Sequence, residues 1–222
     1  MEKRLTRRSS LVTLGGLAAA AAGWRTDDAG AGPAAVASGA VTCVLTPEMT
    51  EGPYYVPDEA VRRNITEGLP GTPLALRLTV VNASTCRPIA GAKVDVWHAN
   101  ALGVYSGVQG NTGTFMRGVQ PTNAHGLALF ETVYPGWYTG RTVHVHVKVH
   151  LGGNVVHTGQ LFFPDSLTDG VYTKAPYSTR PGRDVRNATD AIFRNGGSRS
   201  MLKLSRGGSG YVGALALGVH RT

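Results

Sequence analysis

The sequence lacks several features that would each point to a particular class of protein. Its 222 residues include only two cysteines, so no more than one disulfide can form. No run of lysine or arginine follows Arg8, and the formal charge of +8 is scattered, which argues against nucleic-acid binding. No apolar stretch is long enough to span a bilayer, and no internal repeat is present. With 42% hydrophobic residues, the length is enough for one well-buried domain.

Residues 1–40 have the composition of a signal peptide followed by a linker. Four basic residues among the first eight precede an apolar stretch, 11–22, that is too short to cross a bilayer. The pair Arg7-Arg8 resembles a twin-arginine signal, which is read by a receptor that passes folded cargo. An ordinary secretory signal is the alternative. Both interpretations predict an extracytoplasmic protein that is free of the membrane once the signal is removed.

Both cysteines, Cys43 and Cys86, lie in the predicted mature part of the chain, residues 41–222. An oxidising destination favours a disulfide between them. Two free thiols are the alternative, because the geometry of the pair cannot be read from the sequence.

Residues 41–222 are predicted to form a single all-β domain, an antiparallel β-sandwich. Apolar and polar residues alternate with period two from Leu74 to Val80, and turn residues follow. The 30 glycines and 12 prolines suit the many turns of such a fold. Two long connections, 101–123 and 164–200, are the expected places for a site, because long loops on a rigid sheet often carry function. The other predicted strands are 92–98, 127–133, 142–151 and 160–163.

His144 and His146 lie in the predicted strand 142–151. Residues i and i+2 of a strand project from the same face, so the two imidazoles can reach one metal ion. A polar strand face is the alternative explanation, because Lys148 and His150 share the same parity. The histidine pair alone therefore does not establish a metal site.

Two tyrosines strengthen the metal interpretation. Tyr105 and Tyr138 lie in glycine-flanked loops outside the apolar strand pattern, where their phenols are free to bind a metal. A phenol deprotonates near pH 10 in water, so it binds at neutral pH only to a strong Lewis acid. Two phenolates, one hydroxide and two neutral imidazoles would balance the charge of Fe(III), whereas divalent copper or zinc would leave the site anionic. The residues thus predict one Fe(III) per chain.

Five stretches of the sequence resemble the intradiol ring-cleavage dioxygenases, the enzymes that cleave catechol and protocatechuate, and especially their exported relatives. Together they cover the chain from about residue 45 to residue 163, in the order of the family. The predicted sandwich would then carry its metal site on its long loops. The stretches are LTPE (45–48) with TEGPYY (50–55), GAKVDVWHA (91–99) with GVYSG (103–107), YPGWY (134–138), RTVHVH (141–146) and TGQLFF (158–163).

The resemblance implies a set of metal ligands. Tyr105 is similar to the tyrosine that stays on the iron, and Tyr138 is similar to the tyrosine released when substrate arrives. His144 and His146 match the two imidazole ligands. The same frame leaves Tyr134, four residues before Tyr138, as a packing residue.

Two polar residues are implied to act on substrate and oxygen. Arg141 matches the arginine that steadies the charged substrate intermediate, and a guanidinium can stabilise developing carbanion character. Gln160 matches the glutamine that lines the oxygen-side pocket. Tyr54 and Tyr55 are expected at the mouth of the pocket. His98, in the strand before the Tyr105 loop, is expected to be scaffold and not a ligand.

The implied function is a non-haem Fe(III) dioxygenase that cleaves catechol-type rings between the two hydroxylated carbons. Its partners would be a small-molecule catechol and O2, and its product a muconate-type diacid. The sequence leaves open which catechol is the substrate, and whether the chain is a monomer or a homo-oligomer.

Two alternatives belong to other classes of protein. The first is a non-catalytic sandwich module, because residues 86–94 resemble a hairpin common to transthyretin-like and carbohydrate-binding domains. The second is a copper or zinc protein that uses only His144 and His146. Metal analysis separates these alternatives from the iron enzyme.

Overall fold

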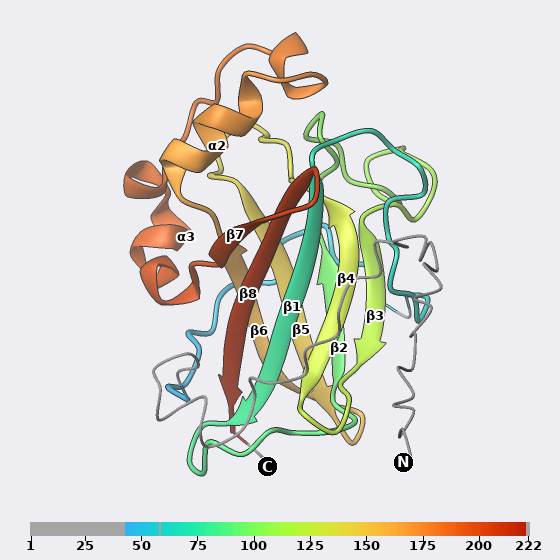
Figure 1. Cartoon of the computed structure of the whole chain (residues 1–222), viewed down its shortest axis with the longest axis vertical. Helices are drawn as coiled ribbons and strands as arrows, with labels where there is room; N and C mark the ends of the chain where they lie inside the picture. Colours follow the sequence, from blue (N-terminus) through green and yellow to red (C-terminus); the bar gives the residue numbers. More distant parts are fainter. Residues whose placement is uncertain (1–42, 58, 221–222) are drawn as a thin grey trace, which may run out of the picture.

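The computed structural model describes residues 43–57 and 59–220, so the predicted signal segment lies outside the described residues. These residues form a two-layer β-sandwich, as predicted, with the helical segments gathered on one side of it (Figure 1). The strands are β1 (Pro73–Asn82), β2 (Lys93–Trp97), β3 (Arg117–Pro121), β4 (Leu127–Val133), β5 (His144–Leu151), β6 (Asn154–Phe162), β7 (Lys203–Gly207) and β8 (Gly210–Val219). The helices are α2 (Asp165–Tyr172) and α3 (Ala191–Arg194), with 3-10 turns η1 (Tyr177–Thr179), η2 (Asn187–Thr189) and η3 (Gly197–Ser200).

The strands are divided equally between two sheets. Sheet A has the order β4-β1-β8-β7, and sheet B has the order β3-β2-β5-β6. The strand pairs are antiparallel, as predicted, with the exception of β1 and β8, which run parallel. Sheet A is mixed because β8, the last strand, returns to an inner position beside β1, the first strand.

One strand lies where the sequence predicted only a loop. β3 (Arg117–Pro121) falls inside the connection 101–123, so that part of the prediction was wrong. Its five residues show no alternation of apolar and polar side chains, and the first of them is a buried arginine. The strand forms because its backbone pairs with all five residues of β2.

The main core lies between the two sheets. Leu74, Leu76 and Leu78 of β1 are at most 1% exposed and face sheet B. From sheet B, Val143 just before β5 and the alternate valines of β5, Val145, Val147 and Val149, pack into the same core. The other face of β5, which carries His144 and His146, is also buried, so a further layer must cover it.

Residues 43–56, which we call the N-terminal strap, run from sheet A to sheet B. Near its start, Thr46 N donates to Gly218 O of β8 at 2.9 Å, and Gly218 N donates to Thr46 Oγ1 at 2.9 Å. Further along, Met49 N donates to Thr158 O of β6 at 2.9 Å. The strap thus brings the segment after Glu48 over sheet B.

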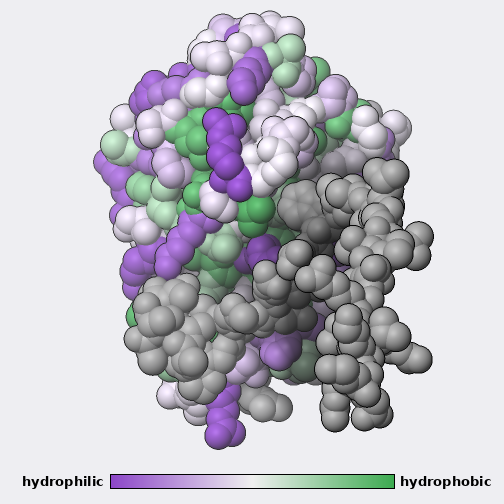
Figure 2. Space-filling model, viewed as in Figure 1, coloured by the Kyte–Doolittle hydropathy of each residue, from purple (hydrophilic) through white to green (hydrophobic). Residues whose placement is uncertain are grey.

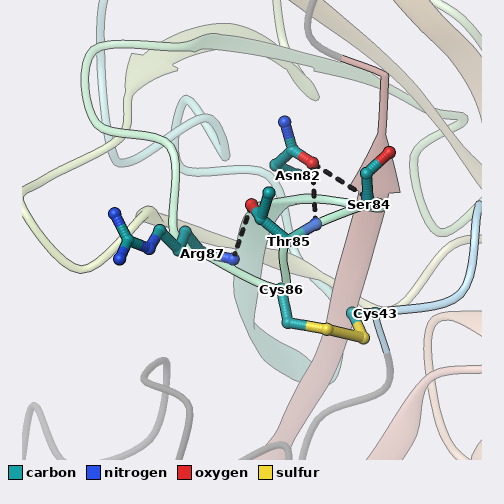
Figure 3. Close-up of a disulfide and its surroundings, with 6 residues drawn as sticks. All are labelled: Cys43, Asn82, Ser84, Thr85, Cys86 and Arg87. Atoms are coloured by element: carbon teal, nitrogen blue, oxygen red, sulfur yellow. Dashed lines mark hydrogen bonds between the residues drawn. A yellow bond between two sulfur atoms is a disulfide. The ribbon is translucent and has the colours of Figure 1, made fainter.

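A disulfide holds the start of the strap. Cys43 is bonded to Cys86 in the turn between β1 and β2 (Figure 3), which decides between the two alternatives that the sequence left open. The turn is ordered by Asn82, whose side-chain oxygen accepts hydrogen bonds from Ser84 N at 2.8 Å and Thr85 N at 3.0 Å. The disulfide therefore joins the strap to a turn that is itself well hydrogen-bonded.

The face of the molecule turned to the viewer in Figure 1 mixes hydrophilic and hydrophobic residues (Figure 2). Sheet A lies toward this side, and its inner strands present partly exposed residues such as Arg77 and Ala214 between buried ones. No helix in the described part of the chain has the length and apolar character needed to cross a membrane.

Candidate metal centre

His144 and His146 bring two ring nitrogens together on the outer face of sheet B. Their Nε2 atoms lie 3.0 Å apart, and the two rings are almost perpendicular, with a centroid separation of 4.6 Å. The side chains share a face because they are two residues apart on β5, as the sequence indicated. Both residues are at most 3% exposed.

The protonation of these histidines suits metal binding. Burial, and secondarily the nearby charge of Arg141, lowers the pKa of His144 to about 3. Burial and the neighbouring His144 lower the pKa of His146 well below its usual value. His144 Nδ1 lies 2.6 Å from Thr142 O and must donate to that carbonyl, so its Nε2 carries a lone pair. A neutral imidazole lone pair therefore points at the neighbouring ring.

The two predicted tyrosines meet this pair from separate loops. Tyr138 Oη lies 3.3 Å from His144 Nε2, and the Tyr105 ring lies 5.6 Å from the Tyr138 ring and 6.2 Å from the His146 ring, measured between centroids. Tyr105 is 4% exposed, whereas Tyr138 is only partly buried. The four residues proposed as ligands from sequence thus lie around one point.

The charges and unpaired atoms of the cluster fit a bound cation. The buried Tyr105 hydroxyl has no hydrogen-bond partner among the described residues. Burial, and then the adjacent Tyr138, raises the pKa of Tyr105 well above its usual value, so without a cation the phenol stays neutral. Leaving a buried hydroxyl unpaired costs about 1–3 kcal/mol, and a metal bond removes that cost. Phenol oxygens with imidazole nitrogens form a donor set that favours ferric iron.

The described residues contain no group of three or more His, Cys, Asp or Glu side chains placed to hold a metal. Two imidazoles alone would be an incomplete zinc site, since structural and catalytic zinc sites use at least three protein ligands. The tyrosine oxygens are therefore essential to any metal centre at this position.

Arg141 and Gln160 lie beside the cluster and bond to each other. Arg141 Nη2 donates to Gln160 Oε1 at 2.6 Å, and Gln160 Nε2 donates to Thr50 O of the strap at 3.0 Å. Gln160 faces the centre because it is the cross-strand partner of His146 in the β5–β6 pairing. The Gln160 amide therefore orients the arginine and ties it to the strap.

Asp190 is a member of the site that the sequence did not reveal. Its fully buried carboxylate accepts from Arg141 Nε at 2.8 Å and from Thr142 N at 2.9 Å. Burial acts to raise the pKa of Asp190, but hydrogen bonds from Arg141 and from two backbone amides outweigh it and leave the pKa below its usual value. Asp190 also caps α3 by accepting from Phe193 N at 2.8 Å, and that capping pattern is the only local signal it gives.

Aromatic rings of the strap and of β2 enclose the centre. Trp97 stacks on His146 with a centroid separation of 4.8 Å and an interplanar angle of 7°. The ring centroids of Tyr54 and Tyr105 lie 4.7 Å apart, and the Tyr54 hydroxyl accepts a hydrogen bond from Gln109 Nε2 at 3.0 Å. These rings exclude water from one side of the cluster.

Lys148, whose shared parity weakened the histidine signal, has a separate role on this face. Its ammonium lies 3.4 Å from the centroid of the Tyr55 ring and pairs with Glu51. Lys148 therefore anchors the strap next to the centre. Its ammonium is engaged with Tyr55 and Glu51, so it is not one of the candidate ligands.

His98 and Tyr134, which were expected from the sequence to be structural, pack away from the centre. Both ring nitrogens of His98 are occupied, by Ala99 O and by Thr132 Oγ1, each at 2.8 Å. Tyr134 turns its hydroxyl to Thr168 at 2.8 Å. Neither residue has a free atom to offer a metal.

Comparisons with known proteins agree with this geometry. The sequence pattern of a family described as "Dioxygenase" matches residues 50–170. A solved intradiol ring-cleavage dioxygenase from Tetranychus urticae is 36% identical, with a TM-score of 0.77, and the match covers 80% of this chain and 95% of that one. The chain belongs to the intradiol ring-cleavage dioxygenase family.

Other members of the family match less of their own length or superpose less well. The dioxygenase domain of a dioxygenase and carbohydrate-binding protein fusion from Streptomyces sp. SirexAA-E is 34% identical, with a TM-score of 0.61 and coverage of 78% of this chain and 96% of that one. A chlorocatechol 1,2-dioxygenase of Pseudomonas putida is 30% identical over an alignment 135 residues long, which covers 51% of this chain and 52% of the relative. The chain thus spans about half the length of the curated dioxygenases it matches.

Proposed function

We propose that this chain binds one ferric iron through Tyr105, Tyr138, His144 and His146 and uses O2 to cleave catechol-type rings between the two hydroxylated carbons, giving muconate-type diacids. The observation that carries the proposal is the meeting of two neutral imidazoles with two phenols, one of them buried without a hydrogen-bond partner. When bound, ferric iron supplies the Lewis acidity that holds a catecholate and makes its ring reactive toward dioxygen.

The two phenols are suited to different tasks. Tyr105 is buried against Tyr54, whereas Tyr138 is partly exposed and lies on a loop after Gly136. Tyr138 is therefore the phenol that would move aside for substrate. Its oxygen would accept one of the two protons that a catechol loses on binding, and the hydroxide that completes the charge balance of the site would accept the other.

Arg141 and its partners hold a positive charge where the substrate ring is expected. Two nitrogens of the Arg141 guanidinium are held by hydrogen bonds: Nε donates to Asp190, and Nη2 donates to Gln160. A guanidinium held in this way stabilises negative charge on the ring without reorganising during the reaction. Gln160 and Asp190 act by positioning Arg141.

The test is dioxygen uptake by the iron-loaded mature protein with a panel of catechol, protocatechuate, hydroxyquinol and chlorocatechol. We expect the iron-loaded protein to show a phenolate-to-iron charge-transfer colour and to consume one O2 per ring cleaved. Tyr105→Phe should lose most of the colour and activity, and Tyr134→Phe, four residues from Tyr138, is the control that should keep both. A colourless iron-loaded protein with no uptake on any catechol would refute the proposal, and tight binding of copper or zinc by that protein would favour the second alternative.

We also propose that residues 1–40 direct export through a twin-arginine route and that residues 41–222 form the mature catalytic domain. The Cys43–Cys86 disulfide supports an oxidising destination. Replacing Arg7 and Arg8 together by lysine should retain the protein in the cytoplasm, as judged by cell fractionation. Unchanged export of the double variant would instead indicate an ordinary secretory signal.

A further inference from the structure

Arg117 is a buried cation directly behind Tyr105, and neither its sequence context nor the predicted ligand set singles it out. It is 1% exposed, and its guanidinium carbon lies 6.0 Å from the centroid of the Tyr105 ring. Its position on β3 is opposite Trp97 of β2, the residue whose ring stacks on His146. Arg117 therefore lies near Tyr105 and beside the residue that stacks on His146.

The Arg117 guanidinium hydrogen-bonds to Ser106, the residue that follows Tyr105. Arg117 Nε and Nη2 donate to Ser106 O at 3.1 and 2.7 Å, and Nε also lies 3.1 Å from Ser106 Oγ. Ser106 Oγ in turn donates to Phe115 O at 2.6 Å. The backbone on the C-terminal side of Tyr105 is thus fixed by an arginine fork, which is the most rigid donor geometry that a side chain offers.

The carboxylates near Arg117, those of Glu59 and Asp95, make no hydrogen bond to its guanidinium. Its nearest carboxylate oxygen, Glu59 Oε1, is 3.8 Å from Nε, too far for a hydrogen bond. The buried Nη1 atom has no hydrogen-bond partner among the described residues. A buried charge is costly unless an opposite charge lies close to it, and a Tyr105 phenolate would be such a charge.

Arg141 differs in this respect. Its Nε donates a hydrogen bond to the carboxylate of Asp190 at 2.8 Å. The charge of Arg141 acts on both phenols, whereas the charge of Arg117 acts on Tyr105 and is not among the charges that act on Tyr138.

We propose that Arg117 is a positioning residue for Tyr105: it fixes the turn that carries the phenol and places a positive charge near the phenolate. This inference rests on the proposed function, because only a metal-bound Tyr105 is anionic. It explains, from this chain's own residues, why Tyr105 is the phenol that stays bound while Tyr138 is free to leave.

The experiment compares the visible spectra and iron affinities of iron-loaded wild type, Arg117→Met and Arg117→Lys. Arg117→Met should shift the phenolate-to-iron band to longer wavelength, because the phenolate electrons lose a stabilising positive charge. Its iron affinity should fall by about 10- to 100-fold, as is typical when a residue supporting a metal ligand is removed. Arg117→Lys should return the band toward the wild-type wavelength, since it keeps the charge without the fork.

Glu59→Gln keeps the inference testable if Arg117→Met does not fold. It leaves Arg117 in place and removes the carboxylate that opposes its charge, so the band should shift to shorter wavelength. Arg63→Met is the control: this half-exposed arginine pairs with Glu131 at 3.0 Å, and its loss should leave the band in place.

A wild type that shows the band while neither Arg117→Met nor Glu59→Gln moves it would overturn the role of Arg117 and leave the proposed function intact. An iron-loaded wild type with no such band would instead overturn the proposed function itself.

Discussion

The two sheets of the sandwich bury their strands in different ways. In sheet A, β1 alternates between buried residues such as Leu76 and partly exposed ones such as Arg77. In sheet B, the first six residues of β5 are all buried. One face of β5 packs on sheet A, and the other lies under the Tyr105 loop and the N-terminal strap. Because the Tyr105 loop and the strap cover the outer face of sheet B, that face can bury ionisable groups outside the main core. The candidate metal centre lies on this covered face.

The composition of the buried residues follows this division. The buried residues of β1 and β8 are apolar or glycine. Sheet B buries ionisable and amide side chains, which are costly unless they are paired or used. The inner strands of sheet A therefore bury only apolar side chains and glycine, whereas the outer face of sheet B holds the candidate metal centre. The buried polar residues of that face are Asp95, Arg117, His144, His146, Lys148 and Gln160.

The largest effect should follow a change on the outer face of sheet B. His146→Ala is expected to abolish both the iron-dependent colour and ring cleavage, because it removes a proposed ligand, while the fold persists. Iron analysis, the visible spectrum and a thermal melt measure the three properties. His150→Ala is the matched control, since it lies on the same strand with the same parity but is partly exposed. If His146→Ala kept the colour, the outer face of sheet B would not be the place where iron binds.

A core change in sheet A should act on stability alone. Leu76→Ala creates a cavity at a side chain that is 0% exposed and is expected to lower the free energy of unfolding by about 2–5 kcal/mol. Denaturant unfolding measures the loss. The iron content per folded chain should stay at the wild-type level, and a folded but iron-free Leu76→Ala protein would show that sheet A shapes the centre directly.

Removing the disulfide should have a similar or smaller effect. Cys43→Ser combined with Cys86→Ser opens a link between residues 43 positions apart, which is expected to lower the free energy of unfolding by about 2–4 kcal/mol. The strap keeps its hydrogen bonds to β8 and β6, so turnover of the folded double variant should change little. A large loss of turnover at full folding would mean that the tether itself positions the strap over the centre.

The smallest predicted effect concerns Asp95, and it depends on pH. Burial raises the pKa of Asp95 to about 6, although a hydrogen bond from Tyr55 opposes the shift. Since the folded pKa is above the unfolded value, the carboxylate destabilises the fold above about pH 6, and this penalty disappears as pH falls toward 4. Asp95→Asn should therefore be more stable than wild type by about 1–3 kcal/mol at pH 7.5. Unfolding midpoints between pH 4 and 7.5 should converge at the acid end, and a constant difference would exclude ionisation of Asp95 as its cause.

Local periodicity predicted the parts of the molecule that local rules control. The alternation in β1 and β4 and the shared face of His144 and His146 follow from strand geometry alone. β3 was missed because its pairing with β2, and not its own pattern, makes it a strand.

The supporting residues of the centre could not be predicted in the same way. Asp190 meets Arg141 across 49 positions of sequence, and Arg117 reaches the turn after Tyr105 from an adjacent strand. Such contacts depend on tertiary packing, so an isolated Asp or Arg gives no periodic signal. The resemblance to a family supplied the ligands but no role for these two residues.

The inner position of β8 has a consequence for the order of assembly. A chain leaves the ribosome from its N-terminus, so residues 43–163, with every predicted ligand, emerge before β8 has been made. During that interval one side of β1 is an open edge without its partner strand. Closure of the sandwich, and with it a finished pocket for iron, is therefore a late event that waits for a strand contributing no ligand of its own.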